Sequence, residues 1–159
     1  DSVENFTDLF SWYQQLIAES LGKKGKGLLP IISTLPKDNH SLMQLYLDGP
    51  KNNFFTFFFV KDNPSIKINN KNLLKSHFFL KGKSMYDIKN AQFRATQKVF
   101  SKNNIPFRSF IIDKRKEETL GELFTFFILE TILLARALNV NPFNQPAVEL
   151  IKKETRKNF

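Results

Sequence analysis

The chain has 159 residues, 42% of them hydrophobic and 14% aromatic, which is the size and composition of one domain with its own buried core. It contains no cysteine, so disulfide bonds and thiolate catalysis are excluded. The histidines, His40 and His77, have no carboxylate cluster near them in the sequence, so no metal site is predicted. The lack of cysteine fits a reducing compartment, and we predict a cytoplasmic location.

The formal net charge is +9, a property that nucleic-acid-binding proteins share. The lysines, however, are scattered and mixed with asparagines, as at residues 69–72, and neither a zinc finger nor an RNA-binding aromatic motif is present. A basic nucleic-acid binder is therefore a minor hypothesis, which predicts salt-sensitive affinity for random DNA. We expect no nucleic-acid partner.

The most apolar stretch, residues 120–138, includes Glu122, Glu130 and Arg136. Charges at these positions favour a buried helix of a soluble protein over a membrane span. No segment combines a basic start, an apolar run and a small-residue cleavage site, so a signal peptide is not predicted. We expect no membrane association.

Apolar periodicity predicts helices that alternate with short apolar strands. Helices are expected over residues 2–19, 40–47, 84–103 and about 118–139, and from about Pro146 onward. Strands are expected over residues 28–33, 54–60 and 107–112. Residues 61–83 are expected to form a polar connection with a minor strand near Ile66, and Ser84 with Asp87 forms a capping-box pattern. This alternation predicts an α/β fold with a mainly parallel sheet covered by helices on both sides.

Three stretches carry side chains suited to chemistry. Gln15 and Glu19 are four residues apart and share one helical face, where Glu19 is either a general base or an ordinary surface glutamate. His40, near a helix start, is either a proton carrier or a structural histidine. Gln145 and Lys152 lie seven residues apart on one face of the last helix, with the lysine leaning back toward the glutamine. Out of context, Lys152 is an ordinary solvated lysine.

The residues of these stretches, and the order in which the stretches occur, resemble those of the phosphoglucose isomerase family. The chain carries Glu19-Ser-Leu-Gly-Lys23, then His40-Ser-Leu-Met-Gln-Leu-Tyr-Leu-Asp-Gly49, and finally Asn141-Pro-Phe-Asn-Gln-Pro-Ala-Val-Glu-Leu-Ile-Lys152. The last motif is the most specific, although Asn144 stands where the family often has aspartate and Ala147 where it has glycine. The resemblance covers nearly the whole chain and implies the C-terminal sugar-isomerase (SIS) domain, a flavodoxin-like three-layer αβα sandwich spanning residues 1–159.

The resemblance implies interconversion of glucose 6-phosphate and fructose 6-phosphate, a step of glycolysis and gluconeogenesis. Glu19 would move a proton between C2 and C1 through a cis-enediol. His40 and Lys152 would assist ring opening, and Gln15 and Gln145 would hold the phosphate end. No metal or organic cofactor is implied.

The family also has a preceding SIS domain with a Ser/Thr-rich phosphate loop and a glycine-flanked arginine, and neither is present in this sequence. We therefore expect the chain to be a fragment with little activity of its own. The resemblance further implies a homodimer in which His40 serves the neighbouring subunit. A non-catalytic sugar-phosphate-binding SIS module remains the alternative, since fold alone does not fix function.

Overall fold

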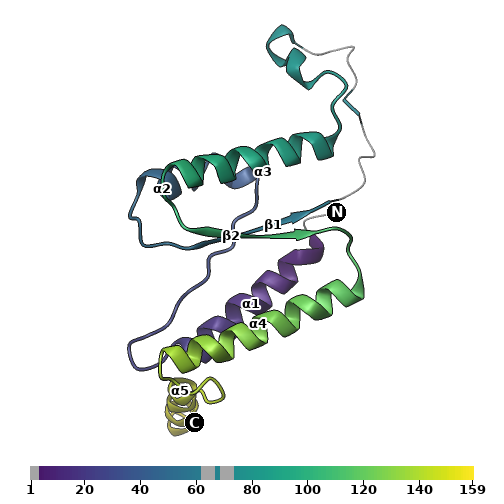
Figure 1. Cartoon of the computed structure of the whole chain (residues 1–159). Coiled ribbons are helices and arrows are strands. Elements are labelled where there is room, and N and C mark those ends of the chain that lie inside the picture. Colours follow the sequence, from purple (N-terminus) through teal and green to yellow (C-terminus); the bar gives the residue numbers. More distant parts are fainter. Residues whose placement is uncertain (1–3, 62–66, 69–73) are drawn as a thin grey trace. The chain divides into compact units, whose positions relative to one another are not determined.

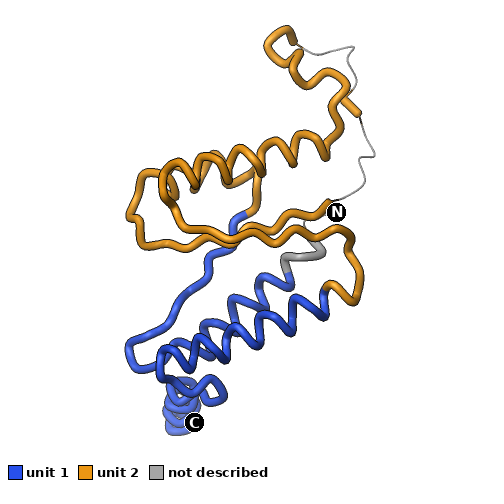
Figure 2. The backbone as a smooth tube through the Cα atoms, viewed as in Figure 1, with its two compact units in different colours: residues 1–33, 120–159 blue, residues 34–119 orange. Residues whose placement is uncertain are grey.

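A computed structural model of the chain describes residues 4–61, 67–68 and 74–159, and side chains of the first helix from Asp8 onward. The chain divides into two compact units. One comprises Asp1–Ser33 with Leu120–Phe159, and the other comprises Thr34–Thr119, as Figure 2 shows.

The unit of residues 34–119 is built around two parallel strands, β1 (Phe55–Val60) and β2 (Phe107–Ile112). Their register runs from Phe55 beside Phe107 to Val60 beside Ile112. Parallel neighbours need a long crossover connection, and helix α3 (Met85–Lys102) provides it (Figure 1). The predicted α/β class with a parallel sheet is therefore confirmed, as are both strands and the α3 helix.

Aromatic side chains fill the space between the sheet and α3. Successive residues of a strand point to opposite faces, so Phe55, Phe57 and Phe59 share one face of β1. Phe59 stacks on Phe93 of α3 with ring centroids 4.7 Å apart, and Phe100 meets Phe55 and Phe57 edge to face at 4.9 and 5.2 Å. Such pairs contribute roughly 0.5–1.5 kcal/mol each beyond the burial of their apolar area.

The rest of this unit consists of short helices and connections. Before β1 lie the 3-10 helix η1 (Lys37–Asn39) and helix α2 (Met43–Asp48), and the 3-10 helix η3 (Lys75–Leu80) precedes α3. The prediction of a helix from His40 onward is wrong at its start, because His40 ends η1 and the chain turns before α2 begins. The strand expected near Ile66 lies outside the described residues, although Lys67 forms an isolated antiparallel bridge with Ser84.

The other unit packs helix α1 (Glu4–Leu21) against helix α4 (Glu117–Ala137), side by side in Figure 1. Trp12 contacts Phe124, and Tyr13 contacts Phe127 and donates a hydrogen bond to Glu130. Further along both helices, Ile17 and Leu21 form a buried cluster with Ala135 and Val140. Because the contacts advance in the same direction along both helices, α1 and α4 run parallel and their C-terminal ends meet. Helix α5 (Pro146–Lys157) follows, beginning at Pro146 as predicted.

Two expectations about this unit need correction. Residues 28–33 form no strand. Pro30 lacks a backbone N–H for a ladder, and its carbonyl accepts a hydrogen bond from the Gln14 side chain instead. In addition, α4 is buried along one stripe only, since Leu129 and Leu133 are 55% and 66% exposed. Even so, none of the described helices is apolar and long enough to cross a membrane.

The predicted capping box at the start of α3 is confirmed. The Ser84 hydroxyl accepts a hydrogen bond from the Asp87 N–H at 3.1 Å, and the Asp87 carboxylate accepts from the Ser84 N–H at 2.8 Å. We predict that Ser84→Ala lowers the free energy of unfolding by about 1 kcal/mol, measured by urea denaturation. Ser101→Ala, an exposed position late in the same helix, is the matched control and should leave stability unchanged.

The same cap should depend on pH. The Ser84 backbone N–H, and then its hydroxyl, lower the pKa of Asp87 below its usual value of 3.8. A carboxyl group with a lowered folded-state pKa stabilises the fold above its ordinary pKa, and this contribution is lost as the pH falls through the folded value. Ser84→Ala keeps the backbone N–H and removes only the hydroxyl, so the stability difference between wild type and Ser84→Ala should shrink in part in acid. An undiminished difference at low pH would contradict the bond from the hydroxyl to the carboxylate.

Candidate functional site

The Glu19 carboxylate accepts an amide hydrogen bond on each of its two oxygens. Gln15 Nε2 donates to Glu19 Oε1 at 2.8 Å, and Gln145 Nε2 donates to Glu19 Oε2 at 2.6 Å. All three residues belong to the unit of residues 1–33 and 120–159, and all are exposed. Three of the five predicted site residues are therefore in direct contact.

Helical periodicity explains the position of Glu19. Ile17 and Leu21 of α1 are 1% and 0% exposed and belong to the core shared with α4. Residues four apart lie one above the other on a helix, so Gln15 and Glu19 share a face that is turned away from this core. The carboxylate is thus in solvent, on the last turn of a helix whose other face is fixed by packing.

Gln145 reaches Glu19 because the chain turns back after α4. Val140, 7% exposed, fixes the start of this return in the core cluster. Asn141 Oδ1 then accepts a hydrogen bond from the Phe143 N–H at 2.9 Å, which closes a local turn. Gln145 is the N-cap residue of α5, but its side chain makes no capping bond, because it bonds to Glu19.

A tight glycine-containing loop follows Glu19. Lys23 and Lys26 exchange two backbone hydrogen bonds, of 3.1 and 2.9 Å, and Lys24 and Gly25 between them have positive φ angles of 55° and 69°. Gly27 has a φ of +130°, and a Cβ there would lie 2.8 Å from the Gly22 Cα. Only glycine fits that position without movement of the backbone.

Lys152 lies on α5, seven residues after Gln145. Its side chain leans back along the helix, as predicted, and its Nζ lies 2.7 Å from Glu149 Oε1. Both side chains are more than half exposed, at 59% and 60%, so this ion pair contributes little stability. The ammonium can leave Glu149 for another anion at small cost.

His40 belongs to the unit of residues 34–119, where it is exposed and follows η1 in a turn. Its backbone N–H bonds to the Lys37 carbonyl at 3.4 Å. Its role therefore stays a prediction.

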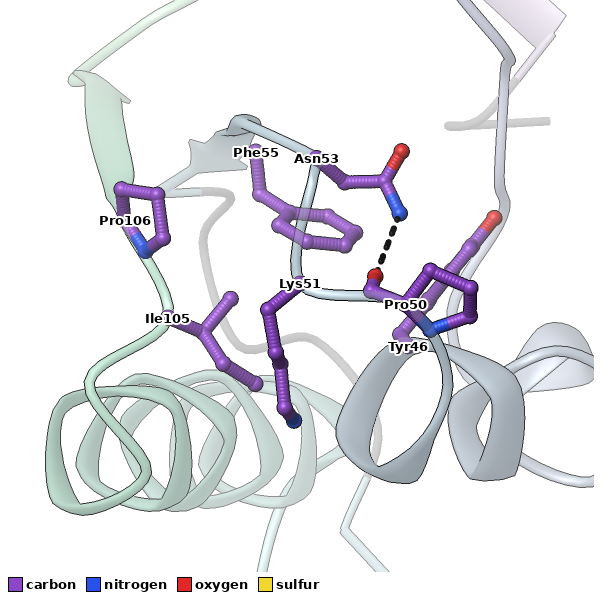
Figure 3. A pocket seen from close by; sticks show the side chains of 7 residues that line it. All are labelled: Tyr46, Pro50, Lys51, Asn53, Phe55, Ile105 and Pro106. Carbon is purple, nitrogen blue, oxygen red and sulfur yellow. Dashed lines mark hydrogen bonds between the residues drawn. The ribbon is translucent and has the colours of Figure 1, made fainter.

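The described residues also form a small cavity near the amino ends of β1 and β2, shown in Figure 3. It is lined by Tyr46, Pro50, Lys51, Asn53, Phe55, Ile105 and Pro106. It has room for about one water molecule and is almost wholly apolar. Ligands of α/β sheets bind beyond the carboxyl ends of the strands, so this cavity is not the candidate site.

Sequence reasoning gave no role to Lys23, although this residue stands within one of the family motifs. In the structure its Nζ contacts two backbone carbonyls, at the end of α1 and in the segment that leads to Gln145. The contact with the end of α1 could have been predicted, because lysines directly after a helix often donate hydrogen bonds to its last carbonyls. The second carbonyl could not be inferred without the fold.

Comparison with known proteins supports the resemblance found in the motifs, although no family model matches. The chain is 41% identical over 146 residues to a glucose-6-phosphate isomerase of Mycoplasmopsis synoviae, which covers 89% of this chain and 34% of that protein. It is 34% identical to the enzyme of the same name from Methanocaldococcus jannaschii, over 95% of this chain and 37% of the relative. The chain thus spans about a third of the length of these relatives.

Part of a solved structure has the same fold. The crystal structure of a hypothetical protein from Thermus thermophilus matches with a TM-score of 0.84 and 28% identity, over 94% of this chain and 38% of that one. By fold, the chain is an α/β protein with a parallel sheet. By sequence, it is a relative of one part of the glucose-6-phosphate isomerases, which confirms the predicted resemblance.

The glycine loop next to Glu19 gives a test of the local structure. We predict that Gly27→Ala lowers the free energy of unfolding by about 1–3 kcal/mol, because it combines an unfavourable φ with a backbone clash. Gly25→Ala is the control, since it has a positive φ but open space around its Cβ, and should cost about 1 kcal/mol. Urea unfolding measures both, and equal losses would contradict the close approach of Gly27 to Gly22.

Proposed function

We propose that the chain is the C-terminal SIS domain of an aldose-ketose isomerase that interconverts glucose 6-phosphate and fructose 6-phosphate. The observation that carries this proposal is the Glu19 carboxylate, held on both oxygens by amide donors at the end of a helix. The similarity to proteins named glucose-6-phosphate isomerase supports the same reaction class. A cytoplasmic location, inferred from the cysteine-free sequence, is part of the proposal.

The reaction requires one base that serves two adjacent carbons. Glu19 removes the proton from C2 of the open-chain aldose, and the C2–H electrons form the enediol double bond as the C1 carbonyl oxygen gains a proton. Glu19 then returns its proton to C1, and the C2 hydroxyl loses its proton to give the ketose. A carboxylate can act as base and then as acid in this way, and such catalysis contributes about 100-fold to 10,000-fold in rate.

The two glutamines position this base. Two amide donors of fixed direction orient the carboxylate, and orientation relative to the reacting carbons supplies much of the rate in a transfer of this kind. The family resemblance assigns Gln15 and Gln145 to the phosphate end of the substrate. In that role, at least one of them exchanges its bond to Glu19 for a substrate oxygen on binding.

Lys152 and His40 assist ring opening in this proposal. The Lys152 ammonium is paired with an exposed glutamate, so a ring oxygen or hydroxyl can replace Glu149 as its partner. His40 acts as the proton carrier of the site on the neighbouring subunit of a homodimer, because imidazole exchanges protons near neutral pH. The sugar phosphate is the substrate, and a second copy of the chain is the partner.

The central test replaces Glu19 with glutamine in the complete gene product that contains this sequence. Glu19→Gln keeps the size of the side chain and one of its two accepting oxygens but removes the base, so kcat for fructose 6-phosphate formation should fall by about 100-fold to 10,000-fold. Glu122→Gln, an exposed position on α4, is the matched control and should retain the wild-type rate.

Two outcomes would reject the proposal. A wild-type protein that binds glucose 6-phosphate without turnover would favour the non-catalytic sugar-phosphate module. An active wild-type protein whose Glu19→Gln variant keeps its rate would exclude Glu19 as the base.

A complementation experiment tests the role of His40. Glu19→Gln and His40→Ala are expected to be nearly inactive as homodimers. If His40 serves the neighbouring subunit, a co-expressed mixture contains heterodimers with one intact site and regains about a quarter of wild-type activity. No gain over the separate variants would mean that His40 acts within its own subunit.

A further inference from the structure

Lys23 joins two parts of the chain that are far apart in sequence. Its Nζ donates one hydrogen bond to the Ser20 carbonyl at 2.9 Å and another to the Asn141 carbonyl at 2.6 Å. Ser20 is the neighbour of Glu19, and Asn141 begins the segment that ends at Gln145. One ammonium thus links the backbone beside the carboxylate to the backbone that carries its amide partner.

Parallel packing explains why lysines occupy this place. The last carbonyls of a helix have no partner within the helix and carry partial negative charge, and the C-terminal ends of α1 and α4 meet here. Lys23 donates to the Ser20 carbonyl at the end of α1, and Lys26 donates to the Leu138 carbonyl at the end of α4 at 2.8 Å. Partial burial lowers the pKa of Lys23, so the ammonium loses some hydration that these carbonyls replace.

We propose that Lys23 is a positioning residue of the isomerase site, which holds the Asn141 segment so that the Gln145 amide is placed beside Glu19. This inference rests on the proposed function for its kinetic part only. Asn141 is four residues before Gln145, and the Asn141–Phe143 turn makes the path between them short and fixed. Loss of the Lys23 bond therefore moves the amide relative to the carboxylate.

Lys26 is the matched control because its contact lies outside this path. Lys26 donates a hydrogen bond to the Leu138 carbonyl. Val140, two residues later, is held independently by its burial in the core cluster. Both lysines bond to a carbonyl near the end of α4, but Lys23 reaches past Val140 to Asn141. Removal of Lys26 should therefore leave Gln145 in place.

The experiment compares Lys23→Met, Lys26→Met and Lys23→Arg in the complete gene product. Lys23→Met should lower kcat about tenfold with a smaller change in KM, because a base that has lost one orienting amide costs rate more than binding. Lys26→Met should retain the wild-type kcat. Lys23→Arg, which keeps donors for both carbonyls, should recover most of the rate.

A second readout needs no activity. The side-chain amide signal of Gln145 in a ¹⁵N–¹H spectrum reports its bond to Glu19, and Glu19→Leu gives the reference for the broken bond. Lys23→Met should shift this signal toward the Glu19→Leu position, whereas Lys26→Met should not. If Lys23→Met fails to fold, Lys23→Gln, which is polar but has a shorter side chain without the ammonium, takes its place in both measurements.

The two readouts separate the two proposals. An inactive wild-type protein would reject the proposed function, while the Gln145 signal would still test the positioning role. An unmoved Gln145 signal in Lys23→Met, or equal effects of Lys23→Met and Lys26→Met on that signal, would overturn the positioning role whatever the activity.

Discussion

The parallel packing of α1 against α4 is the constraint on which the candidate site depends. Ile17 and Leu21 meet Ala135 and Val140 in one buried cluster, so the two helices end at the same place. This arrangement gathers unpaired carbonyls and two negative dipole ends, which lysines of the loop after α1 can stabilise. It also brings the segment after α4 close to the last turn of α1. The contact between Glu19 and Gln145, 126 residues apart, is a direct consequence.

The candidate site is open to solvent. The described residues supply a carboxylate with both oxygens held, two amide donors and an exposed ammonium, all within one unit. They are suited to proton transfer and to contact with hydroxyl groups. The chain spans 34% and 37% of the two relatives.

Local signals in the sequence were sufficient for much of the fold. The capping box of Ser84 with Asp87 and the apolar runs of β1 and β2 act over a few residues, and each was predicted correctly. The apolar run at residues 28–33 was wrongly predicted to be a strand. A strand exists only through hydrogen bonds to a neighbouring strand, and Pro30 cannot donate one. The start of α2 was missed because a 3-10 turn and a helix share similar local propensities.

The candidate site residues likewise divide into those that local sequence signals predicted and those that they did not. The Gln15–Glu19 pair follows from helical spacing and was predicted from the residues alone. Gln145 and Lys152 were placed on one helical face by the same kind of spacing, but no local rule relates Gln145 to a carboxylate so far away in sequence. The Lys23–Asn141 bond needed the tertiary structure, since it depends on where two helices end.

Gln145 shows how a long-range contact and helix capping compete for one side chain. A helix is most stable when the residue at its N-cap bonds to the helix's own free N–H groups, and serine, threonine, aspartate and asparagine do so best. Gln145 occupies that position on α5 and leaves the cap unmade. A short polar residue there would strengthen α5 but could not span the gap to Glu19. Screens that select for thermal stability alone are thus expected to replace this glutamine and, in doing so, to break its contact with Glu19.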